Sequence, residues 1–438
     1  NGGLASNYSL NSAALNITPR AINTVYGTRI YDGTTTVNGS DLSSMNNLVG
    51  SETLTISGAG SLSNANAGSN KSVSVGTLAL SNGSNGGLAS NYTMSGGTHR
   101  LTVNQAPISF TGTRQYDGTT DAANSDITLS GLQGGEALAL SGTGTIASAN
   151  VGSGKSVTLN SLSLGDNTGA ASNYTFTGGT HTFDVTQRVL GSSGSRVYDG
   201  TTNASNSDLT LSNLVGSETL TLSGTGTIAS KNVSSNKTVT LNTLAIADGS
   251  NGGLAANYTL SGGTHQLTVS QRPVNVSGTR LYNALATAVA SDLSTMTNLV
   301  GSETLTLSSN GTIASKDVGS NKTVTIGSLS LGNGSNGGLA ANYTLSGGTH
   351  RLTVNQRPLN ATIARQYDGT TNAAGSDISS FNDLQSSETL TMTGTGTVSS
   401  KNVANGQSVT VGSLALADGS NGGLASNYSL NSAALNIT

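Results

Sequence analysis

Apolar and polar residues alternate along short stretches of this chain. One clear example is Glu218-Thr219-Leu220-Thr221-Leu222, in which the leucines occupy every second position. Because successive side chains of a β-strand point to opposite faces, we expect Leu220 and Leu222 to face inward and the threonines to face solvent. The same alternation recurs in residues 237–241 and 266–269. No stretch has the spacing of an amphipathic helix, so the pattern predicts short, half-buried strands.

Turn sequences separate these stretches at intervals of about ten residues. They are Gly-Thr-Gly-Thr, Gly-Ser-Asn-Gly-Gly and Asp-Gly, which supply positive φ angles or short side chains that cap turns. Several short strands with this spacing predict an antiparallel sandwich or a related small β-fold. We rank a sandwich-like fold first and a β-grasp-like fold second.

The whole pattern returns five times along the chain. A motif built on Tyr-Asp-Gly has its tyrosines 85, 82, 84 and 85 residues apart. An Asn-Tyr pair keeps the same interval, with its tyrosines at Tyr8, Tyr92, Tyr174, Tyr258, Tyr343 and Tyr428. A solenoid coil needs only about 20 to 45 residues, whereas a unit of this length can enclose its own core. We therefore predict an all-β chain, a tandem array of five small antiparallel β-domains arranged end to end as an elongated rod.

Junctions of the Gln-Arg-Pro type set the expected boundaries. Residues 1–18 are interpreted as the tail of a preceding repeat, and the five repeats as residues 19–104, 105–186, 187–270, 271–355 and 356–438. Residues 1–18 are identical to residues 421–438. This identity suggests that a five-repeat block was itself duplicated in a longer parent protein.

Composition and charge exclude several classes of protein. The chain has no cysteine, which excludes disulfides and thiolate metal sites. Its 18 Lys and Arg and 21 Asp and Glu give a net charge of -3 and are scattered singly, so we expect no nucleic-acid partner. No apolar run approaches the length of a membrane span, so we expect no membrane insertion.

The Tyr-Asp-Gly motif is interpreted as structural. An Asp-Gly pair after a strand indicates a tight turn, and the adjacent tyrosine is expected to bury its ring while its hydroxyl bonds a nearby backbone group. The fourth repeat has Tyr282-Asn283-Ala284, so it keeps the tyrosine and loses the carboxylate, which argues against a catalytic role. The motif residues are Arg29, Tyr31, Asp32, Gly33, Arg114, Tyr116, Asp117, Gly118, Arg196, Tyr198, Asp199, Gly200, Arg280, Tyr282, Arg365, Tyr367, Asp368 and Gly369.

One glutamate also recurs at the head of a strand in every repeat. We expect each glutamate to pair with the arginine of the motif, as a surface ion pair that contributes about 0–1 kcal/mol and fixes register. No second acid recurs beside it, as a glycosidase would require, so we expect no enzymatic activity. The glutamates are Glu52, Glu136, Glu218, Glu303 and Glu388.

Recurring histidines and lysines are expected to be structural. A single imidazole per repeat, His99, His181, His265 or His350, cannot form a metal-ligand set, and the fifth repeat has Leu435 at that position. The lysines Lys71, Lys155, Lys237 and Lys322 raise the idea of a Lys-Asn isopeptide bond, but the fifth repeat has Gln407 there. We favour an edge lysine that discourages aggregation.

Two loop motifs also have a structural interpretation. Residues 248–253 resemble a calcium loop, but Asn82 and Asn333 replace the carboxylate in two repeats, which favours a glycine-rich turn. The Asn-Tyr-Ser/Thr tails, such as Asn91-Tyr92-Thr93, match an N-glycosylation acceptor, and a repeated motif can match it by inheritance. We expect no catalytic residue, metal or cofactor in any repeat.

Four stretches in combination resemble a known family. They are Arg-x-Tyr-Asp-Gly-Thr-Thr, Gly-Ser-Glu-Thr-Leu-Thr, Gly-Thr-Gly-Thr-Ile-Ala-Ser-Lys-Asn-Val and Asn-Tyr-Thr-Leu. Together they resemble the YDG repeat domain, which builds the long stalks of large bacterial secreted adhesins, including filamentous-haemagglutinin-like proteins and biofilm-matrix adhesins. The resemblance covers essentially the whole chain, with the fourth repeat as the degenerate copy.

The resemblance implies export by a Gram-negative route and an extracellular, secreted or cell-surface location. The function we expect is that of a structural stalk or spacer that projects a distal binding region for adhesion, aggregation or biofilm formation. The alternative is a multivalent module whose repeats themselves recognise polysaccharide or like chains on neighbouring cells. Expected partners are the other repeats of the same chain, with polysaccharide or a host or neighbouring cell surface bound through regions outside this segment.

Overall fold

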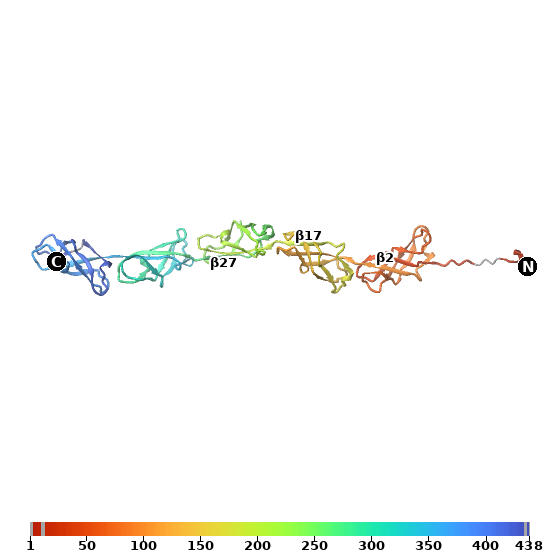
Figure 1. The fold of residues 1–438 in the computed structure, drawn as a ribbon, viewed down its shortest axis with the longest axis horizontal. Helices are drawn as coiled ribbons and strands as arrows, with labels where there is room; N and C mark the ends of the chain where they lie inside the picture. The colour runs from red at the N-terminus through yellow and green to blue at the C-terminus, as the bar shows by residue number, and fades with distance from the viewer. Residues whose placement is uncertain (1–2, 10–13, 433–435, 438) are drawn as a thin grey trace. The chain divides into compact units, whose positions relative to one another are not determined.

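The chain folds into five similar β-domains in tandem, which confirms the predicted class (Figure 1). The computed structural model describes residues 3–9, 14–432 and 436–437. By contacts, the chain divides into two compact units. One unit holds residues 1–189, 214–220 and 248–261, and the other holds residues 190–213, 221–247 and 262–438. The division runs through the third domain, whose residues 214–220 and 248–261 group with the second domain.

The five domains repeat the same succession of strands, except that in the fifth domain one strand, β41 (Arg357–Ile363), replaces both the short opening strand and the first long strand. The short opening strand is β1 (Arg20–Ala21), β11 (Ala106–Pro107), β21 (Arg188–Val189) and β31 (Arg272–Pro273). The first long strand is β2 (Thr24–Ile30), β12 (Ser109–Gln115), β22 (Gly191–Val197), β32 (Asn275–Leu281) and β41 (Arg357–Ile363). Next come β3 (Thr36–Asn38), β13 (Asp121–Ala123), β23 (Asn203–Ser205), β33 (Thr287–Val289) and β42 (Asn372–Ala374). These are followed by β4 (Ser44–Met45), β14 (Ile127–Ser130), β24 (Leu209–Ser212), β34 (Thr295–Thr297) and β43 (Ile378–Asn382).

The second half of each domain begins with the strand that follows the recurring glutamate, β5 (Leu54–Ser57), β15 (Ala139–Ser141), β25 (Leu220–Ser223), β35 (Leu305–Ser308) and β44 (Leu390–Thr393). Then come β6 (Ala59–Ser61), β16 (Thr143–Ile146), β26 (Thr225–Ile228), β36 (Asn310–Ile313) and β45 (Thr395–Val398). The lysine strand is β7 (Gly68–Ser72), β17 (Gly152–Thr158), β27 (Ser234–Thr240) and β37 (Gly319–Thr325), with β46 (Gln407–Thr410) in the fifth domain.

The last three strands complete the domain. They begin with β8 (Ala79–Asn82), β18 (Ser163–Gly165), β28 (Ala245–Asp248), β38 (Ser330–Asn333) and β47 (Ala415–Asp418). The Asn-Tyr strand is β9 (Tyr92–Thr93), β19 (Tyr174–Thr175), β29 (Tyr258–Thr259), β39 (Tyr343–Thr344) and β48 (Tyr428–Leu430). The last strand is β10 (Thr98–Asn104), β20 (His181–Thr186), β30 (His265–Ser270), β40 (His350–Asn355) and β49 (Asn436–Ile437).

The helical elements are single 3-10 turns, and the described part of the chain has no α-helix. One set precedes the Asn-Tyr strand, at η1 (Ala5–Asn7), η3 (Ala89–Asn91), η5 (Ala171–Asn173), η7 (Ala255–Asn257), η9 (Ala340–Asn342) and η11 (Ala425–Asn427). The other lies in the first half of each domain, at η2 (Gly39–Asp41), η4 (Asn124–Asp126), η6 (Asn206–Asp208), η8 (Ala290–Asp292) and η10 (Gly375–Asp377).

The main sheet of each domain is mixed. In the second domain its order is β13-β16-β17-β20-β12-β14, and the central pair, β12 and β20, is parallel. The other pairs in this sheet are antiparallel. The expectation of antiparallel domains is therefore wrong for the pair at the centre. A parallel pair of first and last long strands is the arrangement of a β-grasp, the second-ranked fold, although no described α-helix accompanies it here.

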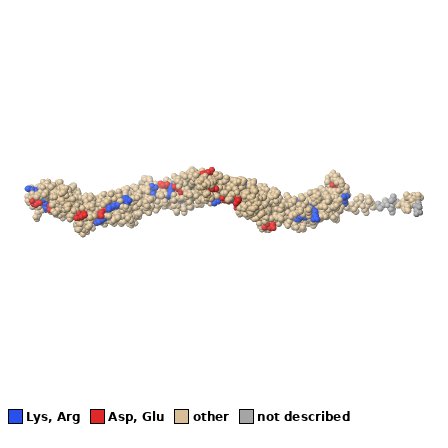
Figure 2. All heavy atoms as spheres, in the orientation of Figure 1, with Lys and Arg blue, Asp and Glu red and all other residues tan. Residues whose placement is uncertain are grey.

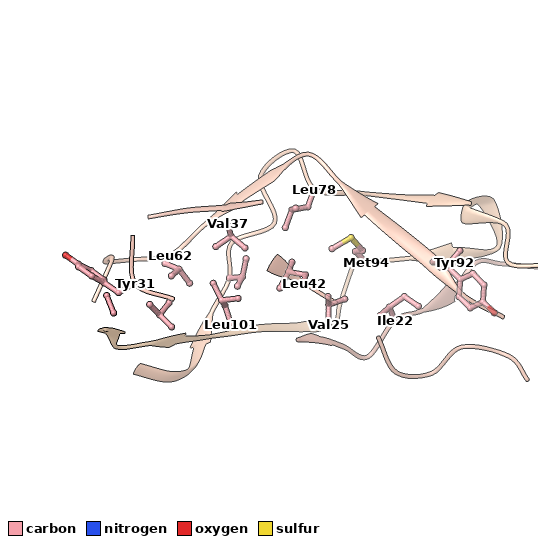
Figure 3. Close-up of a cluster of buried hydrophobic side chains, with 14 of the residues drawn as sticks. Ile22, Val25, Tyr31, Val37, Leu42, Leu62, Leu78, Tyr92, Met94 and Leu101 are labelled. Atoms are coloured by element: carbon pink, nitrogen blue, oxygen red, sulfur yellow. The ribbon is translucent and has the colours of Figure 1, made fainter. Parts of the chain in front are cut away.

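Burial follows the alternation read from the sequence. Leu220 and Leu222 are half-buried and Thr221 is exposed, as predicted. Figure 3 shows the apolar core of the first domain, with Tyr31 at one end and Tyr92 at the other. The two tyrosines that mark the repeat in sequence therefore mark opposite ends of one core.

Charged side chains are sparse on the protein surface. Figure 2 shows them as small separate patches on a mostly uncharged surface. Among the described residues, no helix is long and apolar enough to cross a lipid bilayer.

Candidate functional site

The tyrosine of each Tyr-Asp-Gly motif bonds a glutamate of the next domain. The Tyr31 hydroxyl donates to Glu136 Oε1 at 2.5 Å, and Tyr116 donates to Glu218 Oε1 at 2.6 Å. The same bond joins Tyr198 to Glu303 at 2.7 Å and Tyr282 to Glu388 at 2.6 Å. The prediction that this hydroxyl bonds a nearby backbone group is therefore wrong. Its partner lies 102 to 106 residues farther along the chain.

The second oxygen of the glutamate is held by its own domain. In the fourth domain, the Tyr343 hydroxyl donates to Glu303 Oε2 at 2.6 Å and accepts from the Val300 amide at 3.0 Å. The rings of Tyr198 and Tyr343 meet edge to face, with centroids 5.4 Å apart. Tyr174, Tyr258 and Tyr428 repeat this arrangement. Each junction thus encloses one carboxylate between two tyrosine hydroxyls, one from each domain.

An asparagine makes the second recurring contact of the junction. Asn257 Oδ1 accepts from the Val151 amide of the preceding domain at 2.9 Å, and its Nδ2 donates to Asn150 Oδ1 at 3.0 Å. The other junctions use Asn173, Asn342 and Asn427 in the same way. These four asparagines are at most 1% exposed. A glycan on this nitrogen would displace the contact at these four sites.

Two of the four junctions add a lysine. Lys231 Nζ lies 3.1 Å from Glu303 Oε1, and Lys316 Nζ lies 2.6 Å from Glu388 Oε1. Alanine occupies this position in the first two domains, at Ala65 and Ala149. Burial opposes ionisation of Glu303, but hydrogen bonds from two tyrosines and the lysine outweigh it, so the pKa of that carboxyl lies below its usual value. The pKa of Glu388 is lowered by the same balance.

The arginine of the motif pairs with the aspartate of the motif. The Arg29–Asp32 distance is 3.3 Å, the Arg114–Asp117 distance is 3.2 Å and the Arg365–Asp368 distance is 3.0 Å. Arg196 pairs with Asp199 in the same way. In the fourth domain, where asparagine replaces this aspartate, Arg280 pairs with Asp292 at 3.1 Å. The expected pair between arginine and the recurring glutamate is therefore wrong, because the glutamate belongs to the junction.

The Asp-Gly pair shapes the turn that places the tyrosine. Asp117 Oδ1 accepts from the Thr119 amide at 2.9 Å, and Gly118 has a φ of +80°. A Cβ atom at Gly118 would lie 2.9 Å from Val215 Cγ1 of the next domain. Glycine is therefore favoured here both by the left-handed backbone and by the close approach of the neighbour.

The fourth domain keeps this turn with different residues. Asn283 Oδ1 accepts from the Leu285 amide at 3.1 Å, and Ala284 adopts a φ of +61°. A left-handed alanine is strained, because its Cβ crowds the backbone.

The fifth domain shows the motif without this junction. Tyr367 is 60% exposed, whereas Tyr31, Tyr116, Tyr198 and Tyr282 are at most 4% exposed. Arg365 and Asp368 still form their ion pair, so the turn itself does not require the next domain.

The histidines lie in structural positions. His99 and His350 are buried, and their Nε2 atoms lie 3.1 Å and 2.8 Å from the backbone oxygens of Met94 and Leu345. His181 lies near the Ile108 oxygen, and His265 Nδ1 lies 2.9 Å from the Ser192 hydroxyl. Leu435, the counterpart expected in the fifth domain, lies outside the described residues. Within the described ranges, no group of three His, Cys, Asp or Glu side chains could hold a metal ion.

The lysine strand is not an edge strand in the domains with a six-stranded sheet. In the second domain, β17 lies between β16 and β20. Lys155, Lys237 and Lys322 donate to backbone oxygens of Ser148, Ser230 and Ser315. The edge-lysine interpretation is therefore wrong there. In the first domain, Lys71 Nζ lies 2.9 Å from Asn64 Oδ1. Serine replaces this asparagine in the other domains, so the asparagine that a recurring isopeptide bond would need is missing there.

The loop that resembles a calcium site is a turn that caps a 3-10 turn. Asp248 Oδ1 accepts from the Ala255 amide at 2.7 Å. Asn82 and Asn333 accept from the corresponding amides at 2.8 Å. Asn251 and Gly252 have φ angles of +55° and +88°. The glycine-rich turn interpretation is confirmed.

We predict that Tyr198→Phe loosens its junction while Tyr367→Phe has almost no effect. The first change removes a hydrogen bond to a buried carboxylate, which typically contributes about 1–3 kcal/mol, whereas the second removes an exposed hydroxyl. Hydrogen–deuterium exchange in the peptides containing Val233 and Val300 measures the effect, because exchange reports stability locally. Equal changes in the two variants would contradict this role for the junction.

Alkaline pH is expected to weaken the second junction. Burial, followed by the bond to the Glu218 carboxylate, raises the pKa of both Tyr116 and Tyr258 to about 12, above the ordinary value of about 10. Because the folded pKa is the higher one, this stabilisation is complete below pH of about 10 and is lost as the pH rises toward 12. Tyrosinate absorbance should therefore rise later in the folded chain than in the same chain in denaturant. Superimposable titration curves would refute the prediction.

Ala284→Gly is expected to stabilise the fourth domain by about 1 kcal/mol, because glycine relieves the left-handed strain. The opposite change, Gly369→Ala in the fifth domain, should destabilise by a similar amount, since its φ is +75° and no heavy atom lies within 4 Å of the added Cβ. Domain-resolved hydrogen exchange checks both changes. Shifts in the same direction for the two variants would rule out backbone strain as the cause.

The comparisons with known proteins agree with this repeated architecture. The YDG domain matches the chain five times, at residues 13–100, 98–182, 185–266, 264–351 and 349–435. A search of curated proteins found no match to the chain. The five matches cover nearly all of the sequence and contain both halves of each junction. The chain therefore belongs to the YDG-domain family, as a tandem of five domains.

Proposed function

We propose that this chain is a structural stalk or spacer segment of a bacterial cell-surface or secreted adhesin. It would hold a distal binding region away from the cell for adhesion, aggregation or biofilm formation. The observation that carries the proposal is the junction between neighbouring domains. It joins the Tyr-Asp-Gly end of one domain to the glutamate end of the following domain, and it occurs four times with the same hydrogen bonds. Because these ends lie on opposite sides of a domain core, repeated joining favours a series of domains (Figure 3).

The central strand pair supports a mechanical role. The first long strand of each domain lies near the point where the chain enters, and the last strand leads out of the domain. These two strands are parallel neighbours. Pulling the chain at both ends slides one strand along the other, so it loads the bonds of the whole ladder together. In the second domain, this ladder spans six residue pairs, from Phe110↔His181 to Gln115↔Thr186. Such loading suits a segment that transmits force.

The partners and location follow from the same proposal. The first partner of each domain is the adjoining domain of the same chain. Polysaccharide or a host or neighbouring cell surface would be bound through regions outside this segment, and the protein would be secreted or displayed on the cell surface. No catalytic activity or cofactor is part of the proposal.

The multivalent-binder alternative receives less support. Tyrosines that could stack on sugars are exposed at Tyr8, Tyr26 and Tyr367 among the described residues. Tyr26 is not repeated in the other domains, and the counterparts of Tyr367 are buried in junctions. The domains therefore share no exposed aromatic platform of the kind that avidity from repeated weak sites would use.

Small-angle X-ray scattering of the purified chain tests the proposal. A domain of this size is about 30 Å across, so five in series would give a maximum dimension on the order of 150–200 Å. A single compact particle of this length would measure about 60 Å, and that result would overturn the spacer function.

A matched variant separates the role of the junctions from that of the linkers. Replacing Glu136, Glu218, Glu303 and Glu388 by alanine removes the carboxylates of the four junctions and leaves the apolar cores intact. We expect this variant to sample bent arrangements and to show a broader distance distribution. The variant Glu52→Ala serves as a control, because no described tyrosine of a preceding domain bonds Glu52. An unchanged distribution in the quadruple variant would show that the junctions do not limit bending.

A further inference from the structure

The fifth domain presents a complete set of the residues that the third and fourth domains use toward their neighbours. Tyr367, Lys401, Asn402 and Val403 correspond to Tyr282, Lys316, Asp317 and Val318 of the fourth domain. They line one surface hollow together with Arg365. Tyr367 is 60% exposed and Val403 is 85% exposed, whereas Tyr282 is fully buried. No described residue bonds the Tyr367 hydroxyl or the Val403 amide. The residues of the donor half of a junction are thus brought together and exposed.

The first domain presents the acceptor half. The Tyr92 hydroxyl donates to Glu52 Oε2 and accepts from the Val49 amide at 3.0 Å, which is the arrangement found at the four junctions. Among the described residues, Glu52 Oε1 has no hydrogen-bond partner, whereas its four counterparts accept from a tyrosine of the preceding domain. Asn91 is exposed, although the corresponding asparagines are at most 1% exposed.

The sequence indicates which domain fits the exposed donor half. Residues 1–18, which precede the first domain, are identical to residues 421–438, which close the fifth. A domain with the sequence of residues 19–104 therefore follows, in this chain, the same eighteen residues that end the fifth domain. Charge permits this pairing without selecting it, because Lys401 would meet Glu52 as Lys316 meets Glu388 and every domain carries this glutamate.

We propose that the Tyr367 face of the fifth domain is a docking surface for the Glu52 end of a YDG domain with the sequence of residues 19–104. In this junction, Tyr367 donates to Glu52 Oε1, the Val403 amide donates to Asn91 Oδ1 and Lys401 pairs with the same carboxylate. This inference rests on the proposed function, because it adds a fifth junction to the series of domains that the stalk would consist of.

The test uses the full chain lengthened by one domain, with residues 19–104 joined directly after Thr438. Hydrogen–deuterium exchange of the Val403 amide is compared between the lengthened and the original chain. We expect at least a tenfold slowing in the lengthened chain, toward the rates of the Val233 and Val318 amides, which are internal references. Equal exchange in both chains would overturn the proposal.

The peptides of the added domain report its folding. Because the added domain repeats residues 19–104, its peptides have the same masses as those of the first domain, and the two copies are measured together. If the added copy is folded like the first domain, both copies exchange alike and each peptide shows a single isotope envelope. A folded copy that leaves Val403 unprotected counts against docking. An unfolded copy also counts against it, because the proposal expects the junction to order the copy at least as well as the first domain.

Variants identify the contacts in the lengthened chain. Tyr367→Phe, and Glu52→Ala in the added copy only, should each return Val403 exchange toward the original rate. Tyr26→Phe, which changes an exposed tyrosine away from this face, should leave it unchanged. If scattering supports a spacer while Val403 stays unprotected in the folded, lengthened chain, the docking proposal fails and the proposed function survives. If the original chain is compact while Val403 is protected in the lengthened one, the spacer function fails and the docking surface survives.

Discussion

A carboxylate held between two tyrosine hydroxyls is the contact on which the repeated architecture depends. Burial of an ionised carboxylate costs several kcal/mol unless hydrogen bonds or an opposite charge compensate. Glu303 receives one hydroxyl from Tyr343 of its own domain and one from Tyr198 of the preceding domain. The site is therefore complete only when two domains meet in one register. Loss of either hydroxyl would leave the buried carboxylate less well compensated, so the contact favours this register over others.

The four junctions share the same tyrosine, glutamate and asparagine contacts and differ in whether a lysine is added. The first two rely on the tyrosine, glutamate and asparagine contacts, because alanine stands at residues 65 and 149. The last two add Lys231 or Lys316, whose ammonium compensates the carboxylate directly. These lysines are partly exposed, so solvent screening reduces their contribution to stability. Because every domain carries the glutamate, these lysines add charge compensation at two junctions and do not select one domain over another.

The sequence predicts the elements of each domain better than the contacts between domains. Alternation identifies the strands, and Asp-Gly and glycine-rich loops identify the turns, because both signals are local. The parallel pairing of β12 with β20 has no local signal, since a strand alternates in the same way beside either kind of neighbour. The bond from Tyr31 to Glu136 spans more than one repeat, so comparison of aligned repeats places the two residues in separate columns. The constant separation of about one and a quarter repeats between each tyrosine and its glutamate is the signal that could have paired them.

In the proposed stalk, the strand pair within a domain and the contacts between domains would have different mechanical roles. The first long strand and the last strand of a domain are parallel neighbours, so in the proposed stalk the ladder of hydrogen bonds between them would resist stretching. The junction contacts lie beside the covalent connection, where the last strand of one domain runs into the short opening strand of the next. In the proposed stalk, tension would not have to pass through them, whereas a bend that opens the junction would separate the tyrosine from its glutamate. In the proposed stalk, the strand pair would resist unfolding of each domain, and the carboxylate contact would limit bending between neighbouring domains. Four of the five motif tyrosines donate to a glutamate of the next domain, whereas the turn beside the tyrosine forms with either Asp-Gly or Asn-Ala.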